Sequence, residues 1–268
     1  MTQNGTPTPG PDPMPENGTR ILPDIHDEAT RLTTAVLQAG LHARLLGGLA
    51  VWLRCPSVRT SHFARSYADL DFAIAKGAGS GFKAFLVAEG YVGDQFFNGL
   101  HGDTRLYYQA PDSRWSIDVV IDELVMSHKL DLRGRLDGPA PTISLADLLL
   151  SKLQVWEINR KDLGDALCLL ADHGISEDDR DADSVSLPRL RKVLATDWGF
   201  CHTTERNLER LDDLWGEEPL PAAPFNVGAQ IATLRAAIEA APKTVAWKMR
   251  SRVGERVRWY ETPEEVGH

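Results

Sequence analysis

Two aspartates, Asp69 and Asp71, stand one residue apart in the apolar segment "DLDFAIA" (69–75). This segment reads as a β-strand, in which alternate side chains share a face, so both carboxylates would lie on one side and Leu70 and Phe72 on the other. Two carboxylates this close repel each other unless a cation, a proton or solvent compensates their charge. Which of the three applies depends on the other groups that the fold brings to the same face.

A third aspartate, Asp118, lies in another apolar strand segment, "SIDVVID" (116–122). If the two strands are neighbours, three carboxylates converge on one edge of a sheet. Such a cluster suits Mg²⁺ or Mn²⁺ that bridges polyphosphate oxygens, and two metals held in this way can activate a hydroxyl and stabilise a leaving pyrophosphate. Asp122 falls on the same strand face and is the alternative. We favour Asp118 because apolar residues follow it.

Gly47 and Gly48 end the segment "HARLLGG" (42–48), which reads as a short strand, and precede "LAVWLRC" (49–55), which reads as a short helix. Backbone N–H groups that carry no side chain can approach a phosphate closely at such a junction. The alternative is an ordinary tight turn.

The elements that must position these residues follow from hydrophobic spacing. Residues 1–22 are rich in Pro, Gly, Asn and Thr, and we predict a disordered tail there. After it, residues 23–140 predict a mixed β-sheet with flanking helices. The expected elements are a helix at 25–39, a strand at 42–48, a helix at 49–55 that Pro56 stops, a strand at 69–75, a helix at 81–91 and a hairpin of strands 104–110 and 115–122.

From about Pro141 the spacing of apolar residues is helical, and a second linker at 217–228 precedes one or two final helices. The sequence therefore predicts an α+β fold with a catalytic domain at 23–140 and a helical C-terminal domain at 141–268. Arginines and lysines crowd the last segment among Trp247, Trp259 and Tyr260. Basic residues interleaved with aromatics could bind RNA, although a solvated amphipathic helix is the alternative.

The order of these motifs resembles the nucleotidyltransferase superfamily of DNA polymerase beta. A paired glycine, a short helix, an aspartate dyad on a strand and a third aspartate on a later strand carry the resemblance. Within the superfamily the chain is similar to the AbiEii-like branch, which includes the MenAT-type toxins. The matching residues there are Arg65, four positions before the first aspartate, Lys152 in a helix, and the motif "KDLGD" (161–165). The resemblance spans about residues 25 to 172. The chain departs from the wider pattern at Gly48, where serine is common, at Tyr67, where a small hydroxyl residue is usual, and in the long spacing between Gly48 and Asp69.

The resemblance implies a role for each matching residue. Metal ligands would be Asp69, Asp71 and Asp118, with Asp118 also activating the acceptor; nucleotide-binding residues would be Gly47, Gly48, Arg65 and Lys152; and Asp162 would orient Lys152 or the acceptor, with Asp165 one helical turn later. Two alternatives come from the residues themselves. Lys152 could be a surface lysine whose stem covers an amphipathic helix, and the two aspartates could pair with Arg160 or Lys161 on a solvated face.

The implied activity is Mg²⁺- or Mn²⁺-dependent transfer of a nucleoside monophosphate from an NTP to an acceptor hydroxyl. The acceptor would be an RNA (tRNA) 3′ end, as in the toxin branch, with a cognate antitoxin as a further partner. A small molecule such as an aminoglycoside or a lincosamide is the first alternative. A protein that binds a nucleotide or a partner without turnover is the second.

Composition excludes some other classes. The chain has 268 residues, 43% of them hydrophobic, and a formal net charge of −9, which argues against indiscriminate binding to nucleic acid or to anionic membranes. Its three widely spaced cysteines read as reduced thiols of a cytoplasmic protein. No apolar run approaches the roughly 20 residues that span a bilayer, and the N-terminus has no basic segment followed by an apolar one. We therefore expect no membrane partner and no secretion.

Overall fold

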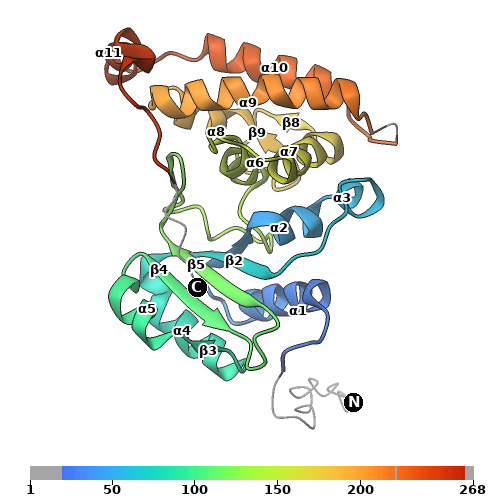
Figure 1. The fold of residues 1–268 in the computed structure, drawn as a ribbon, viewed down its shortest axis with the longest axis vertical. Helices are drawn as coiled ribbons and strands as arrows, with labels where there is room; N and C mark the ends of the chain where they lie inside the picture. Colours follow the sequence, from blue (N-terminus) through green and yellow to red (C-terminus); the bar gives the residue numbers. More distant parts are fainter. Residues whose placement is uncertain (1–19, 221, 263–268) are drawn as a thin grey trace, which may run out of the picture.

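A computed structural model describes residues 20–220 and 222–262. The predicted tail lies outside the described residues except for 20–22, which form neither helix nor strand. The described chain folds into a mixed five-stranded sheet with flanking helices, followed by a region built mainly of helices (Figure 1). This confirms the predicted α+β fold class.

The five-stranded sheet has the strand order β1-β2-β5-β4-β3. Its strands are β1 (Ala43–Leu46), β2 (Asp69–Ile74), β3 (Val92–Gly93), β4 (Arg105–Gln109) and β5 (Ser116–Ile121). The central pair β2 and β5 runs parallel and the other pairs run antiparallel. In the central register Leu70 faces Ile117 and Phe72 faces Val119, and all four side chains are fully buried. The opposite face of the same two strands carries the aspartates, as their alternation requires.

The helices that pack on the sheet are α1 (Ile25–Gln38), α2 (Gly47–Arg54), α4 (Gly79–Ala88) and α5 (Gln95–His101), whereas the short α3 (Pro56–Thr60) packs against α7 (Arg160–Asp172). The Asp24 carboxylate caps α1 by accepting from the backbone of His26 and Asp27. Pro56 does separate two helices, because it cannot continue α2 but fits the first position of α3. Sequence reasoning missed α5 and β3, and it also missed a small hairpin of β6 (Glu123–Val125) and β7 (Lys129–Asp131).

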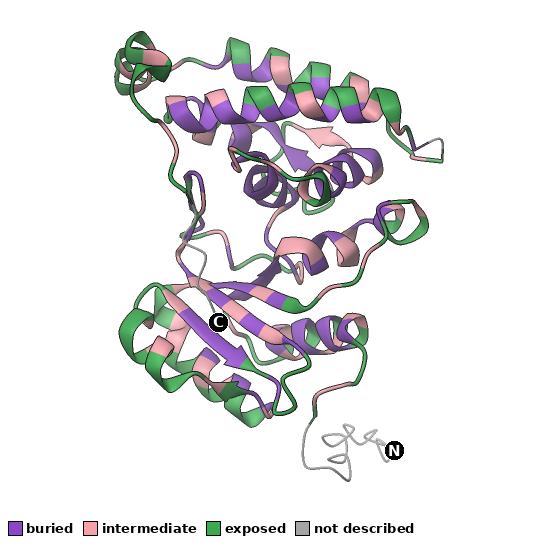
Figure 2. Cartoon of the chain, viewed as in Figure 1, coloured by how far each residue is buried: buried purple, intermediate pink, exposed green. Residues whose placement is uncertain are grey.

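The region after the sheet contains α6 (Leu145–Leu153), α7 (Arg160–Asp172), α8 (Leu187–Leu194), α9 (Trp198–Glu217), α10 (Val227–Ala240) and α11 (Val245–Val253). Two short strands, β8 (Ile175–Ser176) and β9 (Val185–Ser186), and two 3₁₀ turns, η1 (Lys76–Ala78) and η2 (Gly254–Arg256), complete the described elements. Every residue of α6 is buried, so this helix lies at the centre of the region (Figure 2).

The sheet and the helical region are in direct contact. The backbone of Leu45 in β1 donates to Pro141 and accepts from Ile143, at 3.0 and 2.9 Å. One hydrophobic cluster contains buried residues of both parts. The chain segment at the predicted boundary therefore extends the edge of the sheet, and the division near residue 141 stays a prediction.

The three cysteines are free and buried, and burial raises the pKa of each thiol. In the described residues no helix is both long enough and apolar enough to cross a membrane.

Candidate active site

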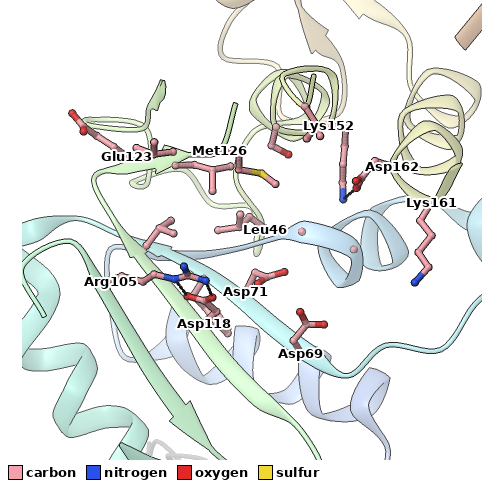
Figure 3. A pocket seen from close by; sticks show the side chains of 18 of the residues that line it. Leu46, Asp69, Asp71, Arg105, Asp118, Glu123, Met126, Lys152, Lys161 and Asp162 are labelled. Atoms are coloured by element: carbon pink, nitrogen blue, oxygen red, sulfur yellow. Dashed lines mark hydrogen bonds and ion pairs between the residues drawn. The ribbon is translucent and has the colours of Figure 1, made fainter. Parts of the chain in front are cut away.

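A cavity of about 1150 Å³ lies over the face of the sheet that carries the aspartates. Its lining includes all the predicted site residues, from Gly47 on β1–α2 to Asp162 on α7. Figure 3 shows Asp69, Asp71 and Asp118 on the sheet side, with Lys152 and Lys161 reaching toward the same space from α6 and α7. Asp165 lies beneath this surface, because its side chain is fully buried.

The three aspartates share one face of the central strand pair. Asp71 and Asp118 are direct partners in the parallel register, and Asp69 is two residues before Asp71 on β2. Burial and the neighbouring charges of Asp69 and Asp118 raise the pKa of Asp71 to about 7. Burial and the two acidic neighbours therefore disfavour the charged form of Asp71.

Asp122, the alternative to Asp118, has a different position. Its backbone has a positive φ of 63°, and its carboxylate accepts from the backbone N–H of Lys76 at 2.9 Å. It is absent from the cavity lining, whereas Asp118 belongs to it. The structure therefore places Asp118 with the aspartate pair, as predicted, and gives Asp122 a capping contact.

Both glycines of the pair are required by close neighbours. Gly47 has a φ of +73°, and a Cβ atom there would stand 2.0 Å from Oδ2 of Asp71. A Cβ atom on Gly48 would stand 2.8 Å from a guanidinium nitrogen of Arg65 and 2.8 Å from the ring of Tyr67. The Tyr67 ring and the Arg65 guanidinium therefore occupy the space that a side chain at position 48 would need. These contacts are compatible with a tight turn as well as with phosphate binding, so the role of the two glycines stays a prediction.

A network of ion pairs connects Lys152 to the β2 side of the cavity. Lys152 Nζ lies 2.8 Å from Asp162 and 2.9 Å from Asp165, and Asp165 also accepts two bonds from Arg65, at 2.5 and 2.8 Å. Burial opposes the charged form of Lys152, but the carboxylates of Asp165 and Asp162 raise its pKa. The Lys152 ammonium is therefore held in place and charged at the cavity wall.

These contacts decide between the alternatives for the helical motif. Lys152 is only 8% exposed, so it is not a surface lysine that covers an amphipathic helix. Arg160 pairs with Glu218 rather than with the aspartates of the motif. The structure brings Lys152, Asp162 and Asp165 together, while Arg65, predicted to bind nucleotide, is held by Asp165 at the edge of the cavity. The catalytic roles of these residues stay predictions.

Arg105 is a residue of the site that sequence reasoning missed. Its guanidinium donates to both carboxylate oxygens of Asp118, through Nε at 2.7 Å and through Nη2. Arg105 on β4 is the diagonal neighbour of Asp118, since Tyr107 faces Asp118 in the antiparallel register. The alternation of "TRLYYQA" puts Arg105 on one face of its strand. Which face that is relative to Asp118 depends on the register of the hairpin, which the length of its loop sets.

The donor set can be tested for its fit to a divalent cation. Carboxylate oxygens are the ligands that Mg²⁺ and Mn²⁺ prefer, and burial together with the charges of Asp69 and Asp118 raises the pKa of Asp71. Within residues 20–220 and 222–262, no group of three or more His, Cys, Asp or Glu side chains has the geometry of a metal site. Asp118 is turned to Arg105 instead. The carboxylates are therefore the right kind of ligand for such a cation, but Asp118 is paired with Arg105 in this structure.

The end of the cavity beyond Asp118 is built from unexpected segments. Leu124, Val125 and Met126 line it, together with Glu261 and Thr262 from the C-terminal end of the described chain. The backbone of Glu261 donates to Ser127 at 3.0 Å, which fixes this segment beside the β6–β7 hairpin.

Comparison with known proteins finds similarity among solved structures. No family model and no curated protein matches it. Among solved structures, it is similar to an antigenic nucleotidyltransferase-like protein from Paracoccidioides brasiliensis, with 13% identity over 83% of this chain and 95% of the other, at a TM-score of 0.40. It is also similar to JHP933 from Helicobacter pylori, with 14% identity over 87% and 97% of the two chains, at a TM-score of 0.33. Similarity at this level does not determine the function of the chain.

Proposed function

We propose that the protein transfers a nucleoside monophosphate from an NTP to an acceptor hydroxyl in a reaction that depends on Mg²⁺ or Mn²⁺. The observation that carries this proposal is the meeting of three strand carboxylates and a buried, charged lysine in one cavity. The three carboxylates repel one another and would attract divalent cations, whereas the fixed ammonium opposite them would attract phosphate groups. The cavity therefore suits a substrate that brings both cations and phosphates.

The chain's own residues support the phosphate half of the reaction. The first turn of α2 receives no side-chain cap, so its N–H groups beside Gly47 and Gly48 are available to an anion. Lys152 would neutralise charge as the bond to pyrophosphate breaks, and Lys161 faces the same space from the first turn of α7 (Figure 3).

Asp118 is the residue that would act on the acceptor. Its carboxylate would orient the acceptor hydroxyl and accept its proton. The hydroxyl oxygen forms the new bond to the α-phosphorus as the bond from that phosphorus to the pyrophosphate oxygen breaks on the opposite side. When bound between Asp69, Asp71 and Asp118, the divalent cations would supply charge neutralisation for the attacking and leaving oxygens.

For the acceptor we propose an RNA 3′ end. A group of aromatic rings and arginines includes Trp259 and Tyr260, which directly precede Glu261 in the sequence, and we call it the aromatic–arginine cluster. Each ring contacts another ring of the group, and each arginine lies over one ring. Its members are Trp156, Trp198, Trp259, Tyr260, Arg206, Arg250 and Arg258. The three guanidinium carbons lie 4.4 to 4.8 Å from the ring centroids. Such platforms bind single-stranded nucleic acid by stacking and by phosphate contacts. The toxin role, the tRNA identity and the antitoxin partner stay predictions of the family resemblance.

One observation favours a small cationic acceptor as the second candidate. Glu261 adds an exposed carboxylate to the acceptor end of the cavity, and a carboxylate attracts an aminoglycoside-like amine more readily than a phosphodiester.

The test uses NTPs labelled at the α-phosphate, with Mg²⁺, against total tRNA and against a panel of aminoglycosides and lincosamides. The proposal predicts labelled RNA from the wild type and no label from Asp71→Asn. Replacing both Arg206 and Arg258 by Gln should make RNA binding less sensitive to salt, with the slope of log K against log [salt] reduced by about 0.7 for each phosphate that the protein no longer neutralises.

Arg180→Gln is the matched control, because the Arg180 side chain is 94% exposed and pairs with Asp178 alone among the ion pairs of residues 20–220 and 222–262. It should leave the salt slope unchanged. Labelling of an antibiotic alone would replace RNA by the second candidate, and no labelled acceptor at all would refute the transfer reaction.

A further inference from the structure

The Arg105–Asp118 pair has a consequence for how the site would take up cations. Arg105 engages both oxygens of the carboxylate that the proposed reaction assigns to a metal. A guanidinium in this fork geometry matches a carboxylate in a way that a lysine cannot. As long as the pair is closed, both oxygens of Asp118 already accept from Arg105, so a divalent cation must share them with the guanidinium or displace it.

The Arg105–Asp118 pair lies at the surface of the cavity rather than in the hydrophobic core. The side chains of Arg105 and Asp118 are 39% and 20% exposed, and both line the cavity. Neither is locked by core packing, and a rotation of the Asp118 side chain about its own bonds would turn the carboxylate from β4 toward its register partner Asp71.

We infer that Arg105 is a positioning residue that competes with the divalent cation for Asp118. In the protein without nucleotide, Arg105 compensates the third carboxylate; when the cation arrives, Asp118 moves from the guanidinium to the metal. The inference rests on the proposed metal-dependent function, and it assigns to Arg105 a role in cation uptake that the carboxylates alone do not explain.

The charge arrangement supports the competition. Asp71 already experiences the repulsion of Asp69 and Asp118, so a cation bound there is attracted by all three carboxylates and repelled by Arg105. Removing the guanidinium removes both the repulsion and the rival partner. Cation affinity should therefore rise, which is the opposite of what the loss of a purely structural ion pair would cause.

The experiment measures Mn²⁺ affinity of the nucleotide-free protein by the electron paramagnetic resonance signal of free Mn²⁺. We expect Arg105→Gln to bind Mn²⁺ about fivefold more tightly than the wild type, the scale of a partly exposed ion pair. Arg105→Lys, which keeps the charge but not the fork, should give a smaller gain. In the Asp118→Asn background, Arg105→Gln should have much less effect, because the carboxylate they compete for is absent.

Arg133→Gln is the charge control. Arg133 pairs with Glu123, which also lines the cavity, but it makes no contact with Asp118 among the described ion pairs. An equal gain in Arg133→Gln, an unchanged or weaker affinity in Arg105→Gln, or no Mn²⁺ binding by any variant would overturn the inference. If Arg105→Gln tightens Mn²⁺ binding but no NTP gives a labelled acceptor, the proposed function fails and the competition stands.

Discussion

Gly47→Ala offers a sharp test of how the fold positions Asp71. Gly47 has a φ of +73°, and a Cβ atom there would stand 2.0 Å from Oδ2 of Asp71, where 3.4 Å is the start of ordinary contact. The carboxylate oxygen would have to move by about 1.4 Å, the difference between these two distances. A displacement of about 1 Å at a reacting group can cost about 100-fold in rate.

Gly40→Ala is the matched control for this substitution. Gly40 also has a positive φ, +65°, but nothing lies within 4 Å of its would-be Cβ atom. Both variants carry the cost of alanine in the left-handed region, about 1–2 kcal/mol, and urea unfolding measures it. Only Gly47→Ala adds the collision with Asp71.

We therefore expect Gly40→Ala to lose about 1–2 kcal/mol of stability and to keep its transfer rate. Gly47→Ala should lose more stability and about 100-fold in transfer of α-labelled nucleotide. If the two variants unfold at the same urea concentration and transfer label equally well, Gly47 does not position Asp71 and this part of the reasoning is wrong.

Two further predictions concern buried polar groups. Asp165→Asn should lower the unfolding free energy by about 3 kcal/mol, because the substitution leaves Arg65 and Lys152 without their buried carboxylate partner. Urea unfolding measures this loss. A loss no larger than that of the exposed variant Asp178→Asn would contradict the prediction. Burial lowers the pKa of His128 to about 4. The unfolded chain therefore takes up a proton at this site first, and wild-type stability should fall from about pH 6.5 to 4 by up to about 3 kcal/mol. His128→Gln should show a shallower fall; an identical profile would refute the assignment.

Local signals were sufficient to predict most of the sheet and the aspartate face. Period-two alternation in the segments around Asp71 and Asp118 predicts two strands with one carboxylate face each, and that alternation survives in the fold because the opposite faces are fully buried. The stop signals of Gly40 and Pro56 were also sufficient, since both act through local backbone geometry.

Features that depend on distant partners could not be predicted in this way. Nothing local to Arg105 identifies Asp118 as its partner, and nothing local to Glu261 places it at a cavity lined by residues more than a hundred positions earlier. The short helix α5 was missed because seven residues carry too little periodicity to distinguish it from a loop. The family resemblance implies that Arg65 binds the nucleotide, but its carboxylate partner Asp165 comes from α7, which no local signal reveals.

The most direct test of the central claim compares two positions of the label in one NTP, with Mg²⁺ and total tRNA. Nucleotidyl transfer places the α-label on the acceptor and the γ-label in pyrophosphate. Asp71→Asn removes a proposed metal ligand, and Asp122→Asn is the control, because Asp122 lies on the same strand segment as Asp118 but outside the cavity lining. The account predicts α-label on the acceptor for the wild type and for Asp122→Asn, none for Asp71→Asn, and no γ-label on the acceptor in any case. Transfer of the γ-label, or full α-label transfer by Asp71→Asn, would contradict it.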